Sequence, residues 1–262
     1  MGLRARLAAL ADKNDVVYSF FTTPAAWFSA AVLVVLVAAA LLAPWLSSVN
    51  PFDLGSLDVT DAHLPPAWTE EGDARFWLGT DDQGRDLLSA ILYGLRLSLS
   101  ISLVSVALSI VIGVGLGVTA GFAGGWIDTV LMRVCDVMLS FPAILVALLV
   151  DGILRSAFPG AAHESVAYFV LIFAITLSGW VPYARTVRGL TLVEKGKEFV
   201  MAAELIGEKK LTVMRRHILP NVLGPVFVLA AVNVATAVMT EATLSFLGVG
   251  VPPTTPSLGT LI

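Results

Sequence analysis

Charged side chains are scarce in this chain of 262 residues: Lys, Arg, Asp and Glu together make up 14% of it. An ordinary soluble domain carries roughly a quarter. Hydrophobic residues make up 57%, and the mean hydropathy is +0.86. So few charged residues cannot cover the surface of a water-soluble domain, which excludes an ordinary soluble enzyme. So many hydrophobic residues also exclude a disordered chain. The net charge of −4 also argues against a nucleic-acid partner. The composition predicts a protein that crosses a membrane several times.

Cysteine and the common catalytic motifs are also missing. The single cysteine, Cys135, has no partner for an intrachain disulfide, and its apolar surroundings predict a packing role. The sequence has no phosphate-binding loop of the G-x-x-x-x-G-K-[ST] type, no H-E-x-x-H pair and no Cys/His cluster. We therefore expect no catalytic residues, no metal site and no cofactor bound by this chain itself.

Long hydrophobic runs dominate what is present. About 20 apolar residues are needed to cross the hydrocarbon core of a bilayer. Five stretches meet this requirement: 25–46, 97–120, 134–154, 165–184 and 221–240. We therefore predict an all-α, polytopic bundle with five transmembrane helices. The last stretch, 242–262, is rich in proline and glycine, so it is predicted to form a loop or a re-entrant hairpin.

The distribution of Lys and Arg predicts the orientation, because these residues accumulate on the cytosolic side. Half of them lie between Arg185 and Arg216, whereas residues 47–90 are strongly acidic. The predicted organisation begins with a cytosolic segment at 1–24 and a first span at 25–46. An outer segment follows at 47–94, and a main transmembrane domain at 95–262 contains a cytosolic loop at 185–220.

Three glycines recur every four residues in the second predicted span: Gly113, Gly117 and Gly121. Small residues on one helix face allow two backbones to approach closely, and such packing is the main force that joins helices in lipid. The spacing favours a tight helix–helix seam. A sliding gate at the same place is the alternative, which spacing does not exclude.

The loop between the fourth and fifth spans has about 35 residues, far more than a helical hairpin needs. Residues 197–206 are predicted to form a short helix, in which Phe199, Ala202 and Ala203 recur at helical spacing. Gly207 suits the left-handed position that ends such a helix. The small side chains leave a shallow surface for a partner, although spacing alone fits a solvated connector equally well.

This loop resembles a known family motif. Met201-Ala202-Ala203-Glu204-Leu205-Ile206-Gly207, followed by Ile218-Leu219-Pro220, is similar to the E-A-A-x-x-x-G…I-x-L-P loop of permease subunits in binding-protein-dependent ABC importers. Met201 replaces the usual Glu, and His217 stands where Ile is general. The run from Arg216 to Asn221 is typical of dipeptide, oligopeptide and nickel permeases. Three further blocks resemble the C-type subunit of that subfamily: Leu78–Asp86, Gly121–Gly125 and Glu241–Gly248.

The resemblance implies a heterodimer with a homologous permease in a bacterial inner membrane. It also implies two cytosolic ATPase subunits, which bind ATP and Mg²⁺, and an extracytoplasmic substrate-binding protein. This chain would form half of the pathway for di- or oligopeptides and would catalyse nothing itself. A helix at 197–208 would contact an ATPase through Phe199, Ala202, Ala203, Glu204, Leu205 and Gly207. Members of the family have six helices, so a sixth is expected after residue 262.

Several alternatives stay open. The substrate could be nickel, glutathione or another small solute in place of a peptide. A proton-coupled transporter is the other alternative, and it is disfavoured because few ionisable groups lie inside the spans. Asn233 either lines the pathway or bridges to another helix. Glu241 contacts the docked binding protein, forms part of an outer gate, or holds the outer loop in place. Asp136 is expected to pair with Arg133, one helical turn away.

Overall fold

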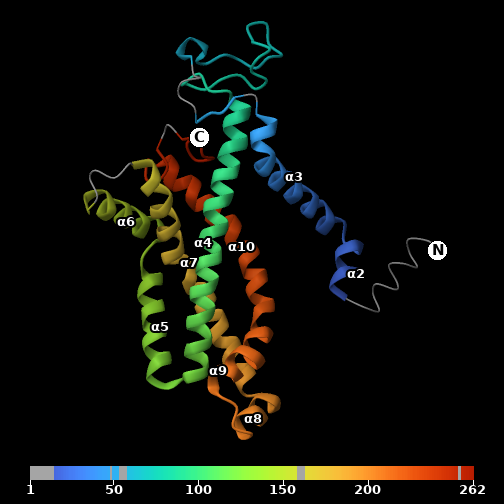
Figure 1. Ribbon diagram of the computed structural model, residues 1–262, viewed down its shortest axis with the longest axis vertical. Helices are drawn as coiled ribbons and strands as arrows, with labels where there is room; N and C mark the ends of the chain where they lie inside the picture. Colours follow the sequence, from blue (N-terminus) through green and yellow to red (C-terminus); the bar gives the residue numbers. More distant parts are fainter. Residues whose placement is uncertain (1–14, 48, 53–57, 158–162, 253–254) are drawn as a thin grey trace, which may run out of the picture. The chain divides into compact units, whose positions relative to one another are not determined.

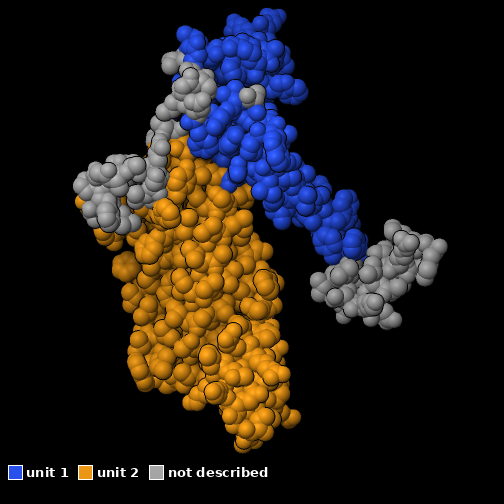
Figure 2. All heavy atoms as spheres, viewed as in Figure 1, with its two compact units in different colours: residues 1–96 blue, residues 97–262 orange. Residues whose placement is uncertain are grey.

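The computed structural model describes residues 15–47, 49–52, 58–157, 163–252 and 255–262. Within these residues the chain consists of helices and loops, with one isolated β-bridge between Thr80 and Asp86. Four of the described helices are long and apolar enough to cross a membrane, or five if one bent pair counts as a single span. The predicted all-α membrane fold is therefore confirmed. The chain divides into two compact units, residues 1–96 and 97–262 (Figure 2).

Unit 1 begins with two helices, α2 (Asp15–Thr22) and α3 (Pro24–Leu46). Thr23 between them is extended, and Pro24 occupies the first turn of α3, where its missing N–H leaves no helical bond unmade. Only Ala40 and Ala43 are buried within α3. Its 23 uncharged residues otherwise expose an apolar surface, as a helix in contact with lipid does.

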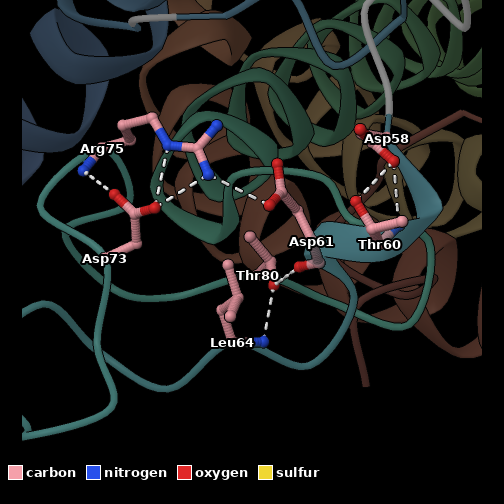
Figure 3. A network of polar contacts seen from close by, with 7 residues as sticks. All are labelled: Asp58, Thr60, Asp61, Leu64, Asp73, Arg75 and Thr80. Atoms are coloured by element: carbon pink, nitrogen blue, oxygen red, sulfur yellow. Dashed lines mark hydrogen bonds and ion pairs between the residues drawn. The ribbon is translucent and has the colours of Figure 1, made fainter.

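Unit 1 also contains a folded loop, residues 58–86, which starts with the short helix η2 (Val59–Asp61) and is held by polar contacts (Figure 3). The Arg75 guanidinium donates to Asp61 at 3.0 Å and contacts Asp73 at 2.8 Å. The hydroxyl of Thr80 accepts a hydrogen bond from the backbone N–H of Leu64 at 2.8 Å. These contacts join parts of the loop that lie up to 16 residues apart, so the loop has a defined shape although it contains little regular secondary structure.

Two carboxylates of this loop have pKa values below the ordinary range. The backbone N–H and the hydroxyl of Thr60 donate to Asp58 and lower its pKa. Hydrogen bonds from the side chain and backbone N–H of Arg75 lower the pKa of Asp73. Each bond is made to the charged form of the acid, which is why it favours ionisation.

Unit 2 is a bundle whose centre is α7 (His163–Lys195), which contacts α5 (Gly125–Ser140), α6 (Ala143–Ala157) and α10 (Leu219–Phe246). The longest helix, α4 (Leu87–Ala123), starts in unit 1 and runs along the bundle (Figure 1). Two short helices, α8 (Glu198–Leu205) and α9 (Lys210–Val213), lie between α7 and α10. The two ends of the predicted 185–220 loop therefore lie in α7 and α10, which pack against each other.

A seam of glycines joins α4 to α7. A Cβ atom built on Gly113 would lie 2.5 Å from the carbonyl oxygen of Trp180, and one on Gly117 would lie 2.6 Å from that of Ala184. A Cβ atom on Gly121 would lie 2.7 Å from Cβ of Thr191. No side chain fits in these gaps, so all three glycines face the partner helix, in the place that the four-residue spacing indicated.

The third predicted span, 134–154, is wrong as a single helix. The structure breaks it into α5 and α6, which meet at an angle of 91°. Pro142 has no N–H to continue the helix, and Phe141 before it is extended (φ −102°, ψ 130°). The hydropathy of the segment is continuous across this proline, which is why hydropathy alone did not indicate the break.

Three further spans are longer than predicted. The second extends from 97–120 to Leu87–Ala123, and the fourth extends to Lys195. The fifth is part of one helical stretch from Lys210 to Phe246, which includes a π-helical turn at Met214–Ile218. Pro220 follows that turn and cannot donate to the carbonyl of residue 216, so a widened turn accommodates it without ending the helix.

After Phe246 the described residues form turns and no helix, as the proline-rich composition indicated. Gly248 and Gly250 have positive φ values of 74° and 142°. A Cβ atom on Gly259 would lie 2.1 Å from the carbonyl oxygen of Ala242, so this segment returns to the end of α10. Pro253, one of the prolines of the predicted 242–262 loop, lies outside the described residues.

Candidate functional site

The predicted loop helix is present as α8, and its two ends are defined by local chemistry. Lys197 precedes it in an extended conformation, and Glu198 in the first turn complements the positive end of the helix dipole. Gly207 has φ +85°. Its N–H donates to Glu204 O and the N–H of Glu208 donates to Ala203 O, both at 3.1 Å, which is the Schellman pattern of a glycine C-cap.

The faces of α8 have different environments. Val200 and Ala203 are buried in a core cluster that also contains Val187 of α7 and Val222 of α10. The other positions are exposed. Glu198 and Glu204 are the charged ones, and the apolar ones are Phe199, Met201, Ala202, Leu205 and Ile206. Leu205 is 87% exposed and Ile206 is 79% exposed. Exposed apolar side chains of this kind make α8 the candidate contact surface of the described residues.

Five of the six residues expected at the coupling surface lie at the surface of α8 or at its cap: Phe199, Ala202, Glu204, Leu205 and Gly207. Ala203 differs from the expectation, since it is 5% exposed and packs against the bundle. It lies three residues after Val200, so the two side chains share the inward face. Its small size sets how closely α8 approaches the core.

Polar contacts hold α8 and its flanking residues to the bundle. Lys195 at the end of α7 donates to the carbonyl oxygen of Phe122 at 2.7 Å, and its ammonium lies 5.0 Å from the centre of the Phe122 ring. After α8, the imidazole Nε2 of His217 lies 3.0 Å from a carboxylate oxygen of Glu208. The residues on both sides of α8 are therefore anchored, Lys195 to α4 and Glu208 to the π-helical turn that leads into α10.

A second set of contacts joins α5 to α7. Arg188 donates from Nε and from a terminal nitrogen to the two carboxylate oxygens of Asp128, each at 2.6 Å. Asp136 lies 3.6 Å from Arg133, as predicted, and also bonds to Arg185 of α7. Sequence reasoning missed Arg185 and Arg188, because their partners lie 49 and 60 residues away and local spacing does not reveal them.

Asn233 lies in the wall of a cavity of about 180 Å³ among α4, α7 and α10. Tyr183 lines the same cavity and was not indicated by the sequence. Glu241 is fully buried and accepts a hydrogen bond from the hydroxyl of Ser245 at 2.8 Å. No group of His, Cys, Asp and Glu side chains among the described residues has the arrangement of a metal site.

Comparisons with known proteins agree with this architecture. Residues 113–262 match the family model "Binding-protein-dependent transport system inner membrane component", and residues 14–66 match "N-terminal TM domain of oligopeptide transport permease C". The first match covers more than half of the chain.

Three curated relatives show the range of the family. The chain is 36% identical over 222 residues to the dipeptide transport system permease protein DppC of Haemophilus influenzae, covering 85% of this chain and 71% of the relative. It is 33% identical over 248 residues to the oligopeptide transport system permease protein OppC of Bacillus subtilis, covering 95% and 75%. It is 35% identical over 231 residues to the glutathione transport system permease protein GsiD of Shigella dysenteriae, covering 88% and 70%.

The helical bundle, the capped loop helix and these matches over most of the chain lead to one assignment. The protein is a multi-pass membrane protein that belongs to the family of inner-membrane components of binding-protein-dependent transport systems, the permease subunits of ABC importers.

Proposed function

We propose that this protein is the C-type permease subunit of an importer for di- or oligopeptides and forms half of its translocation pathway. The support is the set of relatives named for dipeptides, di/tripeptides, oligopeptides and glutathione, each of which contains peptide bonds. These names do not favour the nickel alternative. A proton-coupled mechanism is likewise disfavoured by the family assignment.

The observation that carries the coupling role is the exposed apolar surface of α8. Phe199, Leu205 and Ile206 are large apolar side chains left uncovered by the chain itself, and the glycine cap at Gly207 holds them in a fixed arrangement. In the proposed complex this surface enters a groove of a cytosolic ATPase subunit. Burial of such side chains supplies binding free energy, and the carboxylate of Glu204 beside them orients the partner.

The proposed assembly has a homologous permease, two ATPases and an extracytoplasmic substrate-binding protein. The ATPases bind ATP and Mg²⁺ and carry out hydrolysis, so the present chain needs no catalytic group or cofactor. In this proposal the N-terminus faces the cytosol, and so does the loop that contains α8. The basic residues between Arg185 and Arg216 favour this orientation.

The mechanism follows from how α8 is attached. When ATP draws the ATPases together, each pulls on the α8 surface that it holds. The buried Val200 and Ala203 and the Lys195 contact transmit this displacement to the helix bundle, because packed helices move as rigid elements. The two permeases then alternate between inward-open and outward-open states. Asn233 is proposed to face the pathway, and Glu241, at the opposite end of α10 from α8, to belong to the outer gate.

The coupling proposal is tested by Leu205→Asp and Ile206→Asp in the complete importer. Both side chains point away from the core, so each variant should fold, yet peptide uptake and co-purification of the ATPase should fall at least ten-fold. Trp77→Asp is the matched control, because Trp77 is a large apolar side chain, 70% exposed, in the separate loop of unit 1. Unchanged ATPase retention in both α8 variants would show that α8 is not the contact.

A further inference from the structure

Four exposed basic residues, which we call the basic cluster, directly precede α10. They are Lys209, Lys210, Arg215 and Arg216, in α9, its N-cap and the π-helical turn. None of the four side chains makes an ion pair or a hydrogen bond with a residue that the structure describes. Four like charges this close together repel one another, so their arrangement favours an anionic partner outside the chain.

Other basic residues of the same loop are paired within the bundle. Arg185 and Arg188 at the start of the loop bond to carboxylates of α5. The carboxylate of Glu208, which directly precedes the basic cluster, is engaged by His217 at 3.0 Å. The lack of ion pairs is therefore a property of the basic cluster and not of the whole basic loop.

The length of α10 places the basic cluster at the edge of the bilayer. The single charged residue of α10, Glu241, is fully buried, so the helix exposes no charge from Leu219 to Phe246. These 28 residues span about 42 Å at about 1.5 Å per residue, close to the ~40–45 Å of a bilayer with its headgroups. Arg215 and Arg216 come immediately before this stretch, at the depth of the lipid phosphates.

The segment that carries the basic cluster has an inner and an outer surface. Val213 and Ile218 are buried in the bundle core. Leu211 is 63% exposed and lies four residues before Arg215, on the same side of the segment. An apolar side chain next to cations suits the boundary between acyl chains and headgroups, where apolar groups enter the lipid and charges stay at the phosphates.

The position of the basic cluster favours lipid over the ATPase as its partner. In Figure 1, α8 lies at the end of the bundle, and α9 lies between α8 and α10. The proposed ATPase contact is the surface of α8, whereas the π-helical turn with Arg215 and Arg216 joins directly onto the spanning part of α10. The two arginines therefore lie on the membrane side of the ATPase contact.

We propose that the basic cluster binds the phosphate groups of anionic lipids in the cytosolic leaflet and thereby holds the start of α10 at the headgroup layer. Basic residues immediately cytosolic of a span attract anionic lipids, and a guanidinium donates two parallel hydrogen bonds to a phosphate. The inference rests on the proposed function for the cytosolic orientation of the loop.

The test measures lipid binding to the complete importer, purified in detergent. The probe is phosphatidylglycerol with a fluorescent acyl chain, kept at limiting concentration, and phosphatidylcholine with the same chain is the uncharged control. The variants are Arg215→Gln, Arg216→Gln, both together, and the charge-preserving pair Arg215→Lys with Arg216→Lys. Arg96→Gln is the matched control, because Arg96 is an exposed arginine of α4 that the proposed orientation places on the outer side.

We expect each glutamine variant to weaken phosphatidylglycerol binding about five-fold, and the double glutamine variant about twenty-fold or more. The lysine pair should stay within about two-fold of wild type because it keeps both charges. Phosphatidylcholine binding and the Arg96→Gln variant should be unaffected, and the ATPase should co-purify with every variant.

Three results would overturn the lipid site. The first is equal phosphatidylglycerol affinity in wild type and the double glutamine variant. The second is loss of the ATPase with unchanged lipid binding, which would assign the basic cluster to the ATPase contact. The third is competition by inorganic phosphate as effective as that by phosphatidylglycerol, which would indicate a site for soluble anions. Because binding is measured without transport, a wild-type importer that moves no peptide would contradict the proposed function alone.

Discussion

The α4–α7 seam gives the sharpest test of the fold, because α4 contains a matched pair of glycines. Gly117 faces α7, where an added Cβ would lie 2.6 Å from the carbonyl oxygen of Ala184 and 2.8 Å from Cβ of Val187. Gly115 lies two residues earlier, and an added Cβ there would meet nothing within 4 Å. The change from glycine to alanine is therefore chemically the same at both positions, and only the neighbouring helix differs.

The expected magnitudes have opposite signs. Alanine is favoured over glycine within a helix by about 0.5–1 kcal/mol, so Gly115→Ala should stabilise the protein by about that amount. At Gly117 the same gain is opposed by overpacking, which costs about 1–3 kcal/mol because α4 and α7 must separate. Gly117→Ala should therefore be about 1–3 kcal/mol less stable than Gly115→Ala.

The assay is equilibrium unfolding of the purified chain in mixed SDS and detergent micelles, followed by tryptophan fluorescence. Trp180 lies on α7 beside the seam and is 7% exposed, so its emission should report separation of the two helices. If Gly117→Ala and Gly115→Ala shift the midpoint in the same direction by the same amount, the close approach of α4 and α7 is refuted.

Three other predictions concern the cap, the interhelical ion pair and the loop of unit 1. Gly207→Ala should destabilise α8 by about 1 kcal/mol and Gly207→Asn by less, since asparagine tolerates positive φ, and hydrogen exchange of α8 measures both. Asp128→Asn and Arg188→Gln should each destabilise the bundle by about 1–3 kcal/mol, and the double variant should destabilise it by less than the sum, as a double-mutant cycle in unfolding would show. Asp58 and Asp73 have lowered pKa values, so each stabilises the folded loop only in its ionised form. This contribution to the stability of the loop is complete above the unfolded pKa, near 4, and is lost as the pH falls through the lower pKa values of the folded state. Proteolysis of residues 58–86 should consequently accelerate below pH 4 with an acid-active protease, and an unchanged rate would contradict these contacts.

The sequence predicted α8 well because its signals are local. The spacing of Phe199 and Ala202, the glycine at position 207 and the length of the loop all act within one or two helical turns. The glycine seam was indicated for the same reason, since a four-residue repeat is a property of one helix. The direction in which Ala203 points was not, because the tertiary core decides which face of a short helix is buried.

Contacts between distant segments were outside the reach of such patterns. Arg185 and Arg188 pair with carboxylates on α5, and nothing in the intervening residues marks those pairs. Tyr183 looked like one apolar residue among many in its span, and only the arrangement of three helices places it beside Asn233 in the wall of one cavity. The break at Pro142 was visible as a residue, but its consequence was hidden by the continuous hydropathy around it.

The sequence by itself determined that this chain is a membrane protein, which segments are apolar enough to span, and where the loop helix begins and ends. These properties depend on transfer from water to lipid and on backbone chemistry over a few residues. Only the tertiary structure decided which helices pack together, which face of α8 stays exposed and which polar side chains meet inside the bundle. Those outcomes depend on shape and distance between residues remote in sequence, which no local pattern encodes.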